Sequence, residues 1–167
     1  MGRTTDLRRE IKRRFFPVMT AKGFSADMRH APFFICFRRM TPEAIHVCDI
    51  QWEKYGRPRF VINFGKCSPA GVICHAQPVR PKDVTPSATP LSGRLAPGRH
   101  STVGGWFRQD RPLMESIIHL SRLRPPGEVV TTLLTVFHEV EDWWEDSSVG
   151  PHVCIIAMRY SRDVEAD

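Results

Sequence analysis

Three closely spaced, strand-like runs constrain the fold of this chain more than any other feature. They cover residues 32–40, 44–52 and 59–65, with the sequences PFFICFRRM, AIHVCDIQW and RFVINFG. In the second and third runs, residues alternate with the period of two that turns one face of a strand to a core. The links between the runs are short, as between antiparallel neighbours. The runs therefore predict an antiparallel meander, and a fourth run at residues 70–77 is expected to continue the sheet.

An amphipathic stretch before these strands predicts a helix over residues 4–24. Apolar residues recur every three to four positions from Leu7 through Ile11 and Phe15 to Val18, which places them on one helix face. Pro17 lies inside the pattern and predicts a kink or a break near it. The GF pair at residues 23–24 suits the end of the helix, because glycine accepts the left-handed conformation there.

Helical patterns also follow in the second half of the chain, at residues 111–123 and 127–146. The second of these has an acidic C-terminal half. Acids there oppose the helix dipole, so we expect a basic group nearby, with the first helix as the natural source. Residues 152–160 fit either a strand or a helix. The elements together predict an α+β fold: an antiparallel sheet of four to five strands, packed by an N-terminal helix and a C-terminal helix.

Composition favours a single domain over residues 1–167. The chain is 41% hydrophobic and 25% charged, as in globular proteins. No apolar run approaches the ~18 residues of a membrane span, and the charged N-terminus lacks a secretory apolar core, so we expect a cytoplasmic protein without a membrane partner. The five cysteines are expected to be reduced thiols. The proline-rich stretch 77–100, with five prolines, predicts a long surface loop.

Charge is distributed unevenly along the chain. Residues 1–100 hold 18 Lys and Arg against 7 Asp and Glu, whereas residues 101–167 hold 6 against 11. A basic half can attract nucleic acid or an acidic partner, but the two halves can also face each other and cancel in one fold.

Motifs for cofactor chemistry are incomplete. Gly65 and Lys66 resemble the end of a phosphate-binding loop, but Phe60 stands where its first glycine is required. The HEVED string at 138–142 resembles a zinc-peptidase helix, but Asp142 replaces the second histidine, so a solvated acidic face is expected. No Cys-x-x-Cys pair accompanies the other candidate metal ligands, which are His46, Cys48, Cys67, Cys74 and His75. We therefore expect no metal, no cofactor and no catalytic residue.

The N-terminal part of the chain resembles the bacterial domain-of-unknown-function family numbered 4304. The resemblance lies in a proline-interrupted helix, in the hairpin IQWEKYGRPRFVINFG at residues 50–65 and, more loosely, in residues 94–107. The residues that carry it are Pro17, Gly23, Phe24, Gln51, Lys54, Tyr55, Gly56, Phe60, Asn63, Gly65, Trp106 and Phe107. It implies a fold and a bacterial source, and no activity.

Three functions remain in competition. The leading one is a non-catalytic binding module with a protein partner, including an immunity- or antitoxin-like role. Its candidate site combines the hairpin at 51–66 with a tryptophan: Gln51, Tyr55, Arg57, Arg59, Asn63, Lys66 and Trp106. The second is a nucleic-acid-binding protein using Arg8, Arg9, Arg13, Arg57 and Arg59. The third is a small hydrolase or thiol enzyme near Cys67, Cys74 and His75. Because Asn63 is out of phase with the apolar residues around it, we expect any site on the hairpin to lie on the strand face turned away from the core.

Overall fold

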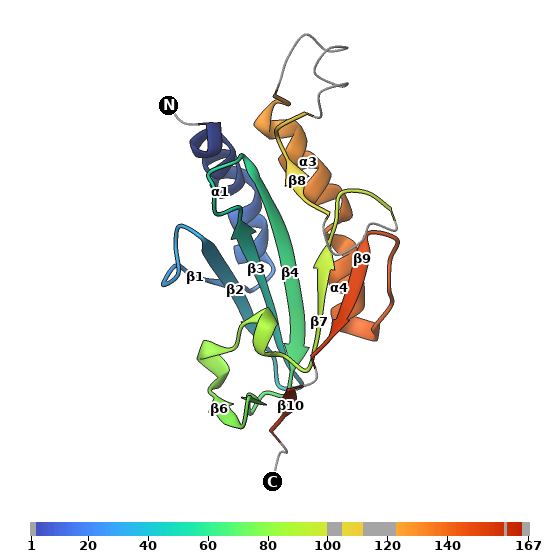
Figure 1. Cartoon of the computed structure of the whole chain (residues 1–167). Helices are drawn as coiled ribbons and strands as arrows, with labels where there is room; N and C mark the ends of the chain where they lie inside the picture. The colour runs from blue at the N-terminus through green and yellow to red at the C-terminus, as the bar shows by residue number, and fades with distance from the viewer. Residues whose placement is uncertain (1–2, 100–104, 112–122, 159, 165–167) are drawn as a thin grey trace.

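The computed structural model describes residues 3–99, 105–111, 123–158 and 160–164. It is an α+β fold with a layer of helices on one face of an antiparallel sheet, and Figure 1 looks onto the opposite face. In the order in which they lie side by side, the strands of the main path are β1 (Ser25–Asp27), β2 (Phe34–Met40), β3 (Ile45–Trp52), β4 (Arg59–Cys67), β7 (Leu91–Leu95) and β9 (Val153–Ala157). A short strand, β8 (Phe107–Arg108), pairs with the start of β4.

Helix α1 (Arg3–Ala21) forms where the amphipathic pattern predicted it. Leu7, Ile11, Phe15 and Met19 are fully buried against the sheet, with Met19 in place of the expected Val18. The helix continues through Pro17, so the predicted break does not occur, and apolar residues on both sides of the proline are held by the core. It ends at Ala21, and the expected glycine, Gly23, follows at φ 82°; the amide of Phe24 donates to the Met19 carbonyl oxygen at 3.0 Å.

The C-terminal helical segment differs from the single helix expected over 127–146. It consists of α3 (Pro126–Val136) and α4 (His138–Asp146), which meet at Phe137. The Phe137 ring packs edge-on against Phe15 of α1 at 5.1 Å, so α1 and the C-terminal helical segment share one core. The expected basic neighbour of the acidic half is present, because Lys22 Nζ donates to Glu141 Oε2 at 2.8 Å. The helix expected over 111–123 lies almost wholly outside the described residues.

Residues 70–100 were predicted to form a further strand of the main sheet and then a long surface loop, and the structure differs on both points. The run at 70–77 does not continue the main sheet. It contributes β5 (Val72–Cys74) to a small second sheet, which the described residues complete with β6 (Gln77–Val79) and β10 (Ser161–Asp163). The proline-rich stretch is not a plain loop. It contains β6, the 3-10 turns η1 (Pro81–Asp83) and η2 (Pro86–Ala88), and strand β7, with prolines at the first position of both turns.

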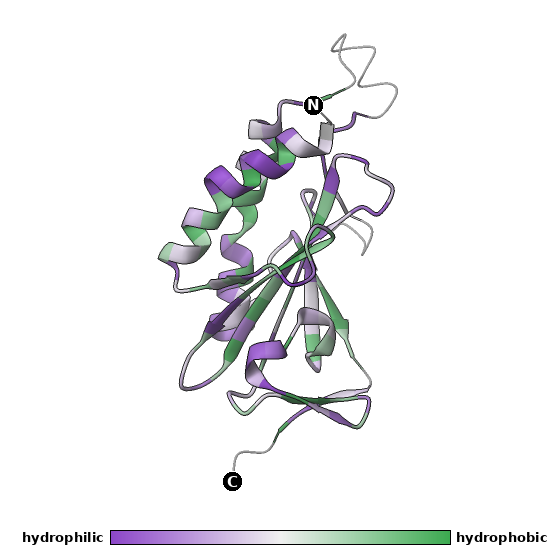
Figure 2. Cartoon of the chain, turned by 90° about the vertical axis from the view of Figure 1, so that its left-hand side faces the viewer, coloured by the Kyte–Doolittle hydropathy of each residue, from purple (hydrophilic) through white to green (hydrophobic). Residues whose placement is uncertain are grey.

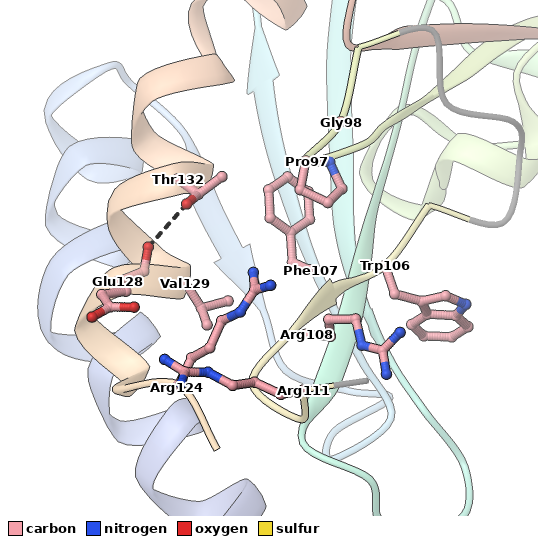
Figure 3. Close-up of a pocket in the computed structure, with 10 residues that line it drawn as sticks. All are labelled: Pro97, Gly98, Trp106, Phe107, Arg108, Arg111, Arg124, Glu128, Val129 and Thr132. Carbon is pink, nitrogen blue, oxygen red and sulfur yellow. Dashed lines mark hydrogen bonds between the residues drawn. The ribbon is translucent and has the colours of Figure 1, made fainter. Parts of the chain in front are cut away.

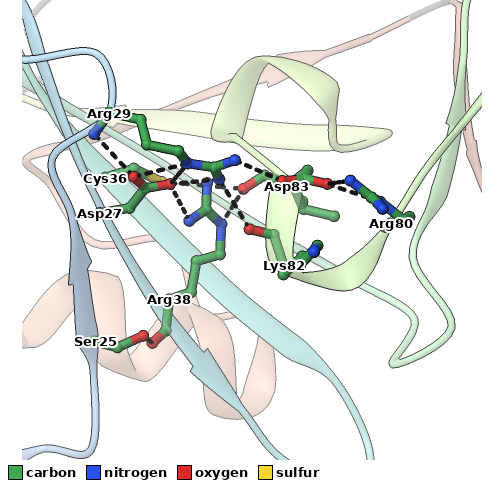
Figure 4. A network of polar contacts seen from close by, with 9 residues as sticks. Ser25, Asp27, Arg29, Cys36, Arg38, Arg80, Lys82 and Asp83 are labelled. Carbon is green, nitrogen blue, oxygen red and sulfur yellow. Dashed lines mark hydrogen bonds and ion pairs between the residues drawn. The ribbon is translucent and has the colours of Figure 1, made fainter.

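An ion-pair network holds this stretch against the sheet (Figure 4). The Arg29 guanidinium joins Asp27 on β1 to Asp83 in η1, at 2.6 and 2.8 Å. Arg38 on β2 bonds the same Asp27 at 2.8 Å and donates from Nε to the Val84 carbonyl oxygen at 2.6 Å. Arg29, just after β1, and Arg38 on β2 thus hold η1 and the following Val84 over the sheet face that the helices leave open.

Apolar side chains gather on both faces of the sheet, in two buried clusters within the described residues. The larger lies between the sheet and the helices, whose apolar sides face inward in Figure 2. The smaller lies on the other face, beneath the 3-10 turns and β5, and comprises Cys36, Ile45, Val47, Cys67, Val72, Val84 and Ala88. This second cluster covers only one end of the open face. The other end carries polar side chains.

Candidate functional site

A row of polar residues crosses the open face of the sheet. Asp49 on β3 lies opposite Asn63 on β4, Asn63 lies opposite Arg94 on β7, and Arg94 lies opposite Cys154 on β9. Directly paired residues in an antiparallel sheet point to the same face, so these four side chains share one surface. That surface faces away from the helices, because the residues alternating with Asn63, namely Ile62 and Phe64, lie in the helix-side core.

Hydrogen bonds join this row into one network. The amide nitrogen of Asn63, Nδ2, donates to Asp49 Oδ1 at 2.8 Å and to Gln51 Oε1 at 3.1 Å. Its carbonyl oxygen, Oδ1, accepts from Arg94 Nε at 2.9 Å. Asn63 is therefore the central member, bonded to side chains on both neighbouring strands through the two ends of one carboxamide. Within the described part of the chain, Asp49 Oδ2 and Gln51 Nε2 make no hydrogen bond.

The network forms the floor of a hollow of about 320 Å³. Phe34 of β2 lies on one side, and Ile156 and Met158 of the β9 segment lie on the other. The turn η2 supplies a third wall through Pro86 and Ser87. The volume is at the lower end of the range of about 300–1,000 Å³ that ligand pockets cover. The hollow can receive a small molecule or a side chain from a larger partner.

Burial perturbs both charged members of the floor. Asp49 is 6% exposed, and burial raises the pKa of its carboxyl group to about 6, although the bond from Asn63 acts in the opposite direction. Burial likewise lowers the pKa of Arg94, and the nearby charge of Asp49 opposes that shift. Titratable groups that are perturbed by burial inside a hollow mark candidate functional sites. In this hollow the two groups are the carboxylate of Asp49 and the guanidinium of Arg94.

The floor is suited to a neutral polar group. It offers acceptors on Asp49 and Gln51 and a donor on Gln51, and the charge of the neighbouring Arg94 guanidinium offsets that of Asp49 at neutral pH. A peptide or carboxamide group has both a donor and an acceptor and matches this pattern. No group of three or more possible metal ligands occurs among the described residues, and no described helix is long and apolar enough to cross a membrane.

The candidate residues on the hairpin at 51–66 do not all lie at one place in the structure. Gln51 and Asn63 lie together in the hollow's floor. Lys66 is on the opposite face, where its Nζ donates to the Trp143 carbonyl oxygen at 3.3 Å and to Ser147 Oγ at 2.9 Å. It thereby neutralises the C-terminal end of α4, a structural role.

The remaining hairpin residues lie near its turn. Glu53 accepts hydrogen bonds from the backbone amides of Tyr55 and Arg57 through Oε2, at 2.8 and 3.1 Å, and so fixes the turn. The Tyr55 side chain is 75% exposed. The Arg59 guanidinium lies over the Trp106 ring at 5.0 Å and 3.7 Å from the Glu53 carboxylate. Neither Tyr55 nor Arg59 reaches the hollow.

Trp106 borders a different and larger pocket, of about 790 Å³ (Figure 3). This pocket lies between β8 and α3, and its basic members are Arg108 on β8, Arg111 after β8 and Arg124 before α3. Arg108 is paired with Asp110 at 2.8 Å. The lining residues are Pro97, Gly98, Trp106, Phe107, Arg108, Arg111, Arg124, Glu128, Val129 and Thr132, and none of them belongs to the hairpin at 51–66. Trp106, which the sequence analysis combined with the hairpin in one candidate site, therefore lines a pocket separate from the hollow on the open face.

Most residues of the two other hypotheses, nucleic-acid binding and thiol catalysis, are engaged in other contacts or buried. Of the arginines proposed for nucleic acid, Arg9 and Arg13 pair with acids one turn away at 2.9 and 2.6 Å, and Arg8 stacks on Trp52 at 4.7 Å. For thiol chemistry, burial raises the pKa of Cys67 to about 12, which is opposite to what a nucleophilic thiolate needs. His75 stacks on Tyr160 at 5.4 Å.

Two members of the row escaped prediction from the sequence. Asp49 stands in an apolar run, in phase with Gln51, and that shared phase was the available signal. Arg94 stands in the proline-rich stretch that was expected to be a loop, so nothing marked it as a strand residue. Sequence spacing does not reveal which residues of distant strands become cross-strand neighbours.

The fold and this site define an α+β protein that carries a buried polar network on the open face of its sheet. Comparison of the chain with protein-family models, curated proteins and solved structures gives no match. The resemblance to family 4304 stays a prediction, and the function is argued from the site.

Proposed function

We propose that this chain is a non-catalytic binding module that receives a protein partner on the open face of its sheet. The observation that carries the proposal is the Asp49–Asn63–Arg94 network at the floor of the hollow. Buried polar networks restrict the side chains that form them to one geometry. A rigid floor with fixed donors and acceptors can select one orientation of an incoming group.

A protein partner fits the surroundings of the hollow better than a polyanion. Phe34 is 40% exposed at one wall, and Met158 and Ile156 form another, so apolar contacts surround a polar centre. Protein interfaces combine aromatic anchors with a small number of placed polar groups. The floor's opposite charges favour a peptide or carboxamide group from a partner loop over a phosphate.

We propose that the hollow is not catalytic because its polar side chains already form hydrogen bonds within the sheet. Asp49 is the best candidate for proton transfer because its pKa is about 6. Its Oδ1 is already bonded by Asn63, and the hydroxyl of Ser92 donates to the Ile156 carbonyl oxygen at 3.4 Å. Both bonds tie these side chains to the sheet, and we assign the open Asp49 Oδ2 to accepting a hydrogen bond from the partner. We place the binding in the reducing cytoplasm, where the five cysteines would stay as free thiols.

Photo-crosslinking in cells that natively produce the protein tests the proposal. A benzophenone amino acid replaces Phe34 at the wall, and the matched control places it at Thr131, an exposed position of α3 on the helix side. We expect a discrete protein adduct at position 34 and none at 131. Replacing Asn63→Ala in the position-34 protein should remove the adduct while the far-UV circular dichroism stays that of the parent.

Three outcomes oppose the proposal. An adduct that nuclease digests would replace the protein partner by nucleic acid. Equal adducts at positions 34 and 131 would show unspecific contact. A persistent adduct in the Asn63→Ala protein would leave the polar floor without a role in binding.

A further inference from the structure

A third cavity lies on the helix side of the sheet, between α1 and the connection from β1 to β2. Its volume is about 420 Å³, within the range of ligand pockets. The walls are apolar and include Phe16 from α1, Pro32 from the connection, Ile35 from β2 and Trp52 from β3. The rim carries the cationic side chains Arg8, Arg9 and Lys12. It shares no lining residue with the hollow on the open face.

Two buried N–H groups at this pocket have no hydrogen-bond acceptor among the described residues. They are Nε of Arg8 and Nε1 of Trp52, and Trp52 is only 3% exposed. Buried polar groups are almost always hydrogen-bonded, and leaving one unbonded is costly. The Arg8 guanidinium lies over the Trp52 ring at 4.7 Å, so the two unsatisfied groups belong to neighbouring side chains of the pocket lining. Burial also lowers the pKa of Arg8.

The cations of the rim lie on one side of α1. Arg8 and Lys12 are four residues apart, which places them on neighbouring turns of one helix face. Arg9 is held by Asp6 at 2.9 Å, whereas Lys12 makes no ion pair within the described part of the chain. Two cations therefore stand over an apolar floor that also contains an unsatisfied indole N–H group. A carboxylate would supply an acceptor to both cations beside this floor.

We propose that this pocket binds an organic monocarboxylate with an apolar body. The carboxylate accepts hydrogen bonds from Arg8 and Lys12 at the rim, and the body lies against Phe16, Ile35 and Trp52. Free phosphate fits this pocket less well, because the apolar walls would remove water from its further oxygens without replacing most of those hydrogen bonds. An alkyl and an aryl acid share this chemistry, and the two bodies can be compared directly.

Nuclear magnetic resonance of the indole N–H groups tests the proposal on the whole chain. The probes are decanoate below its micellar concentration and 2-naphthoate, with decan-1-ol as the neutral control and acetate as the control without a body. We expect both acids to shift the Trp52 Nε1–H resonance, which is assigned from its loss in the Trp52→Phe protein. The tighter of the two acids identifies an alkyl or an aryl body.

Substitutions at the rim separate charge recognition from apolar partitioning. The double variant Arg8→Gln, Lys12→Gln should weaken decanoate binding at least tenfold, since each charge-assisted bond is among the stronger hydrogen bonds. It should leave the weaker binding of decan-1-ol within twofold. The matched control is Arg13→Gln, because Arg13 lies on α1 in an exposed pair with Glu10, and it should change decanoate binding less than twofold.

Each contrary result has a definite meaning. If neither acid shifts the Trp52 resonance, the pocket is not a carboxylate site. If the double variant and the Arg13→Gln control bind decanoate equally, the carboxylate is not recognised at the rim. If decan-1-ol binds as tightly as decanoate, the pocket selects only apolar bodies. Each of these results overturns the proposal.

Discussion

Replacing Asp49 by asparagine should stabilise the protein at pH 8 and change its stability little at pH 4. The carboxyl group is buried, and burial raises its pKa from an ordinary value of 3.8 to about 6. Between these two values the folded state keeps a proton that the unfolded state has released. Stability therefore falls as the pH rises from about 4 to about 6, and the cost stays constant above that range.

The size of the effect follows from the shift. One pKa unit corresponds to about 1.4 kcal/mol, so a shift of roughly two units costs the ionised protein about 3 kcal/mol at pH 8. The asparagine introduced by Asp49→Asn would carry no charge, and its carbonyl oxygen can still accept from the Asn63 amide, as Asp49 Oδ1 does at 2.8 Å. The expected gain of the Asp49→Asn protein is thus up to about 3 kcal/mol at pH 8 and near zero at pH 4.

Urea unfolding of both proteins at pH 4, 6 and 8 measures the difference. The control is Glu145→Gln, an exposed position of α4, whose difference from the parent should vary by no more than a few tenths of a kcal/mol over the same range. A gain that is independent of pH, or an Asp49→Asn protein that is less stable at pH 8, would refute the assignment of a destabilised buried carboxylate. In that case the network would hold Asp49 in its charged form.

Three further predictions concern the scaffold, and urea midpoints measure each of them. Gly93→Ala should destabilise the fold by about 1–3 kcal/mol, because a Cβ there would lie 2.3 Å from Cζ of the buried Phe64 ring; an unchanged midpoint would contradict the close packing. Lys66→Met should cost up to about 1 kcal/mol by removing the cation at the C-terminal end of α4. Hydrogen bonds from Arg29 hold the pKa of Asp27 well below its usual range, so the parent should exceed Asp27→Asn in stability at pH 7 and lose that advantage as the pH falls below about 4.

The sequence predicted those parts of the fold that local patterns determine. The alternation in residues 44–52 and 59–65 located β3 and β4 to within two residues at each end, and the spacing of Leu7, Ile11 and Phe15 identified the buried face of α1. The phase of Asn63 placed its side chain on the open face. These features depend on the period of a single strand or helix and need no knowledge of distant neighbours.

Non-local pairing and turn chemistry explain what the sequence did not predict. The run at 70–77 leaves the main sheet because Gly71 has φ 100° and the chain then reverses at residues 75–76, both with positive φ, so β5 pairs with β6. Prolines argued against structure in 77–100, yet Pro81 and Pro86 begin 3-10 turns, where a missing amide hydrogen costs nothing. Arg94 reaches Asn63 only through the register of β4 with β7.

The two proposed sites lie back to back across the same pair of strands. On β2, Phe34 borders the open-face hollow and Ile35 borders the pocket beneath α1. On β3, Gln51 and Trp52 divide between the two sites in the same way. The period of two thus lets consecutive residues serve opposite faces without sharing a side chain. A substitution at Asn63 therefore alters only the floor of the open-face hollow, and a substitution at Arg8 alters only the rim of the pocket beneath α1. Loss of partner binding and loss of carboxylate binding can thus be observed separately. A variant at Asn63 that also abolished decanoate binding would mean that the strands themselves had shifted.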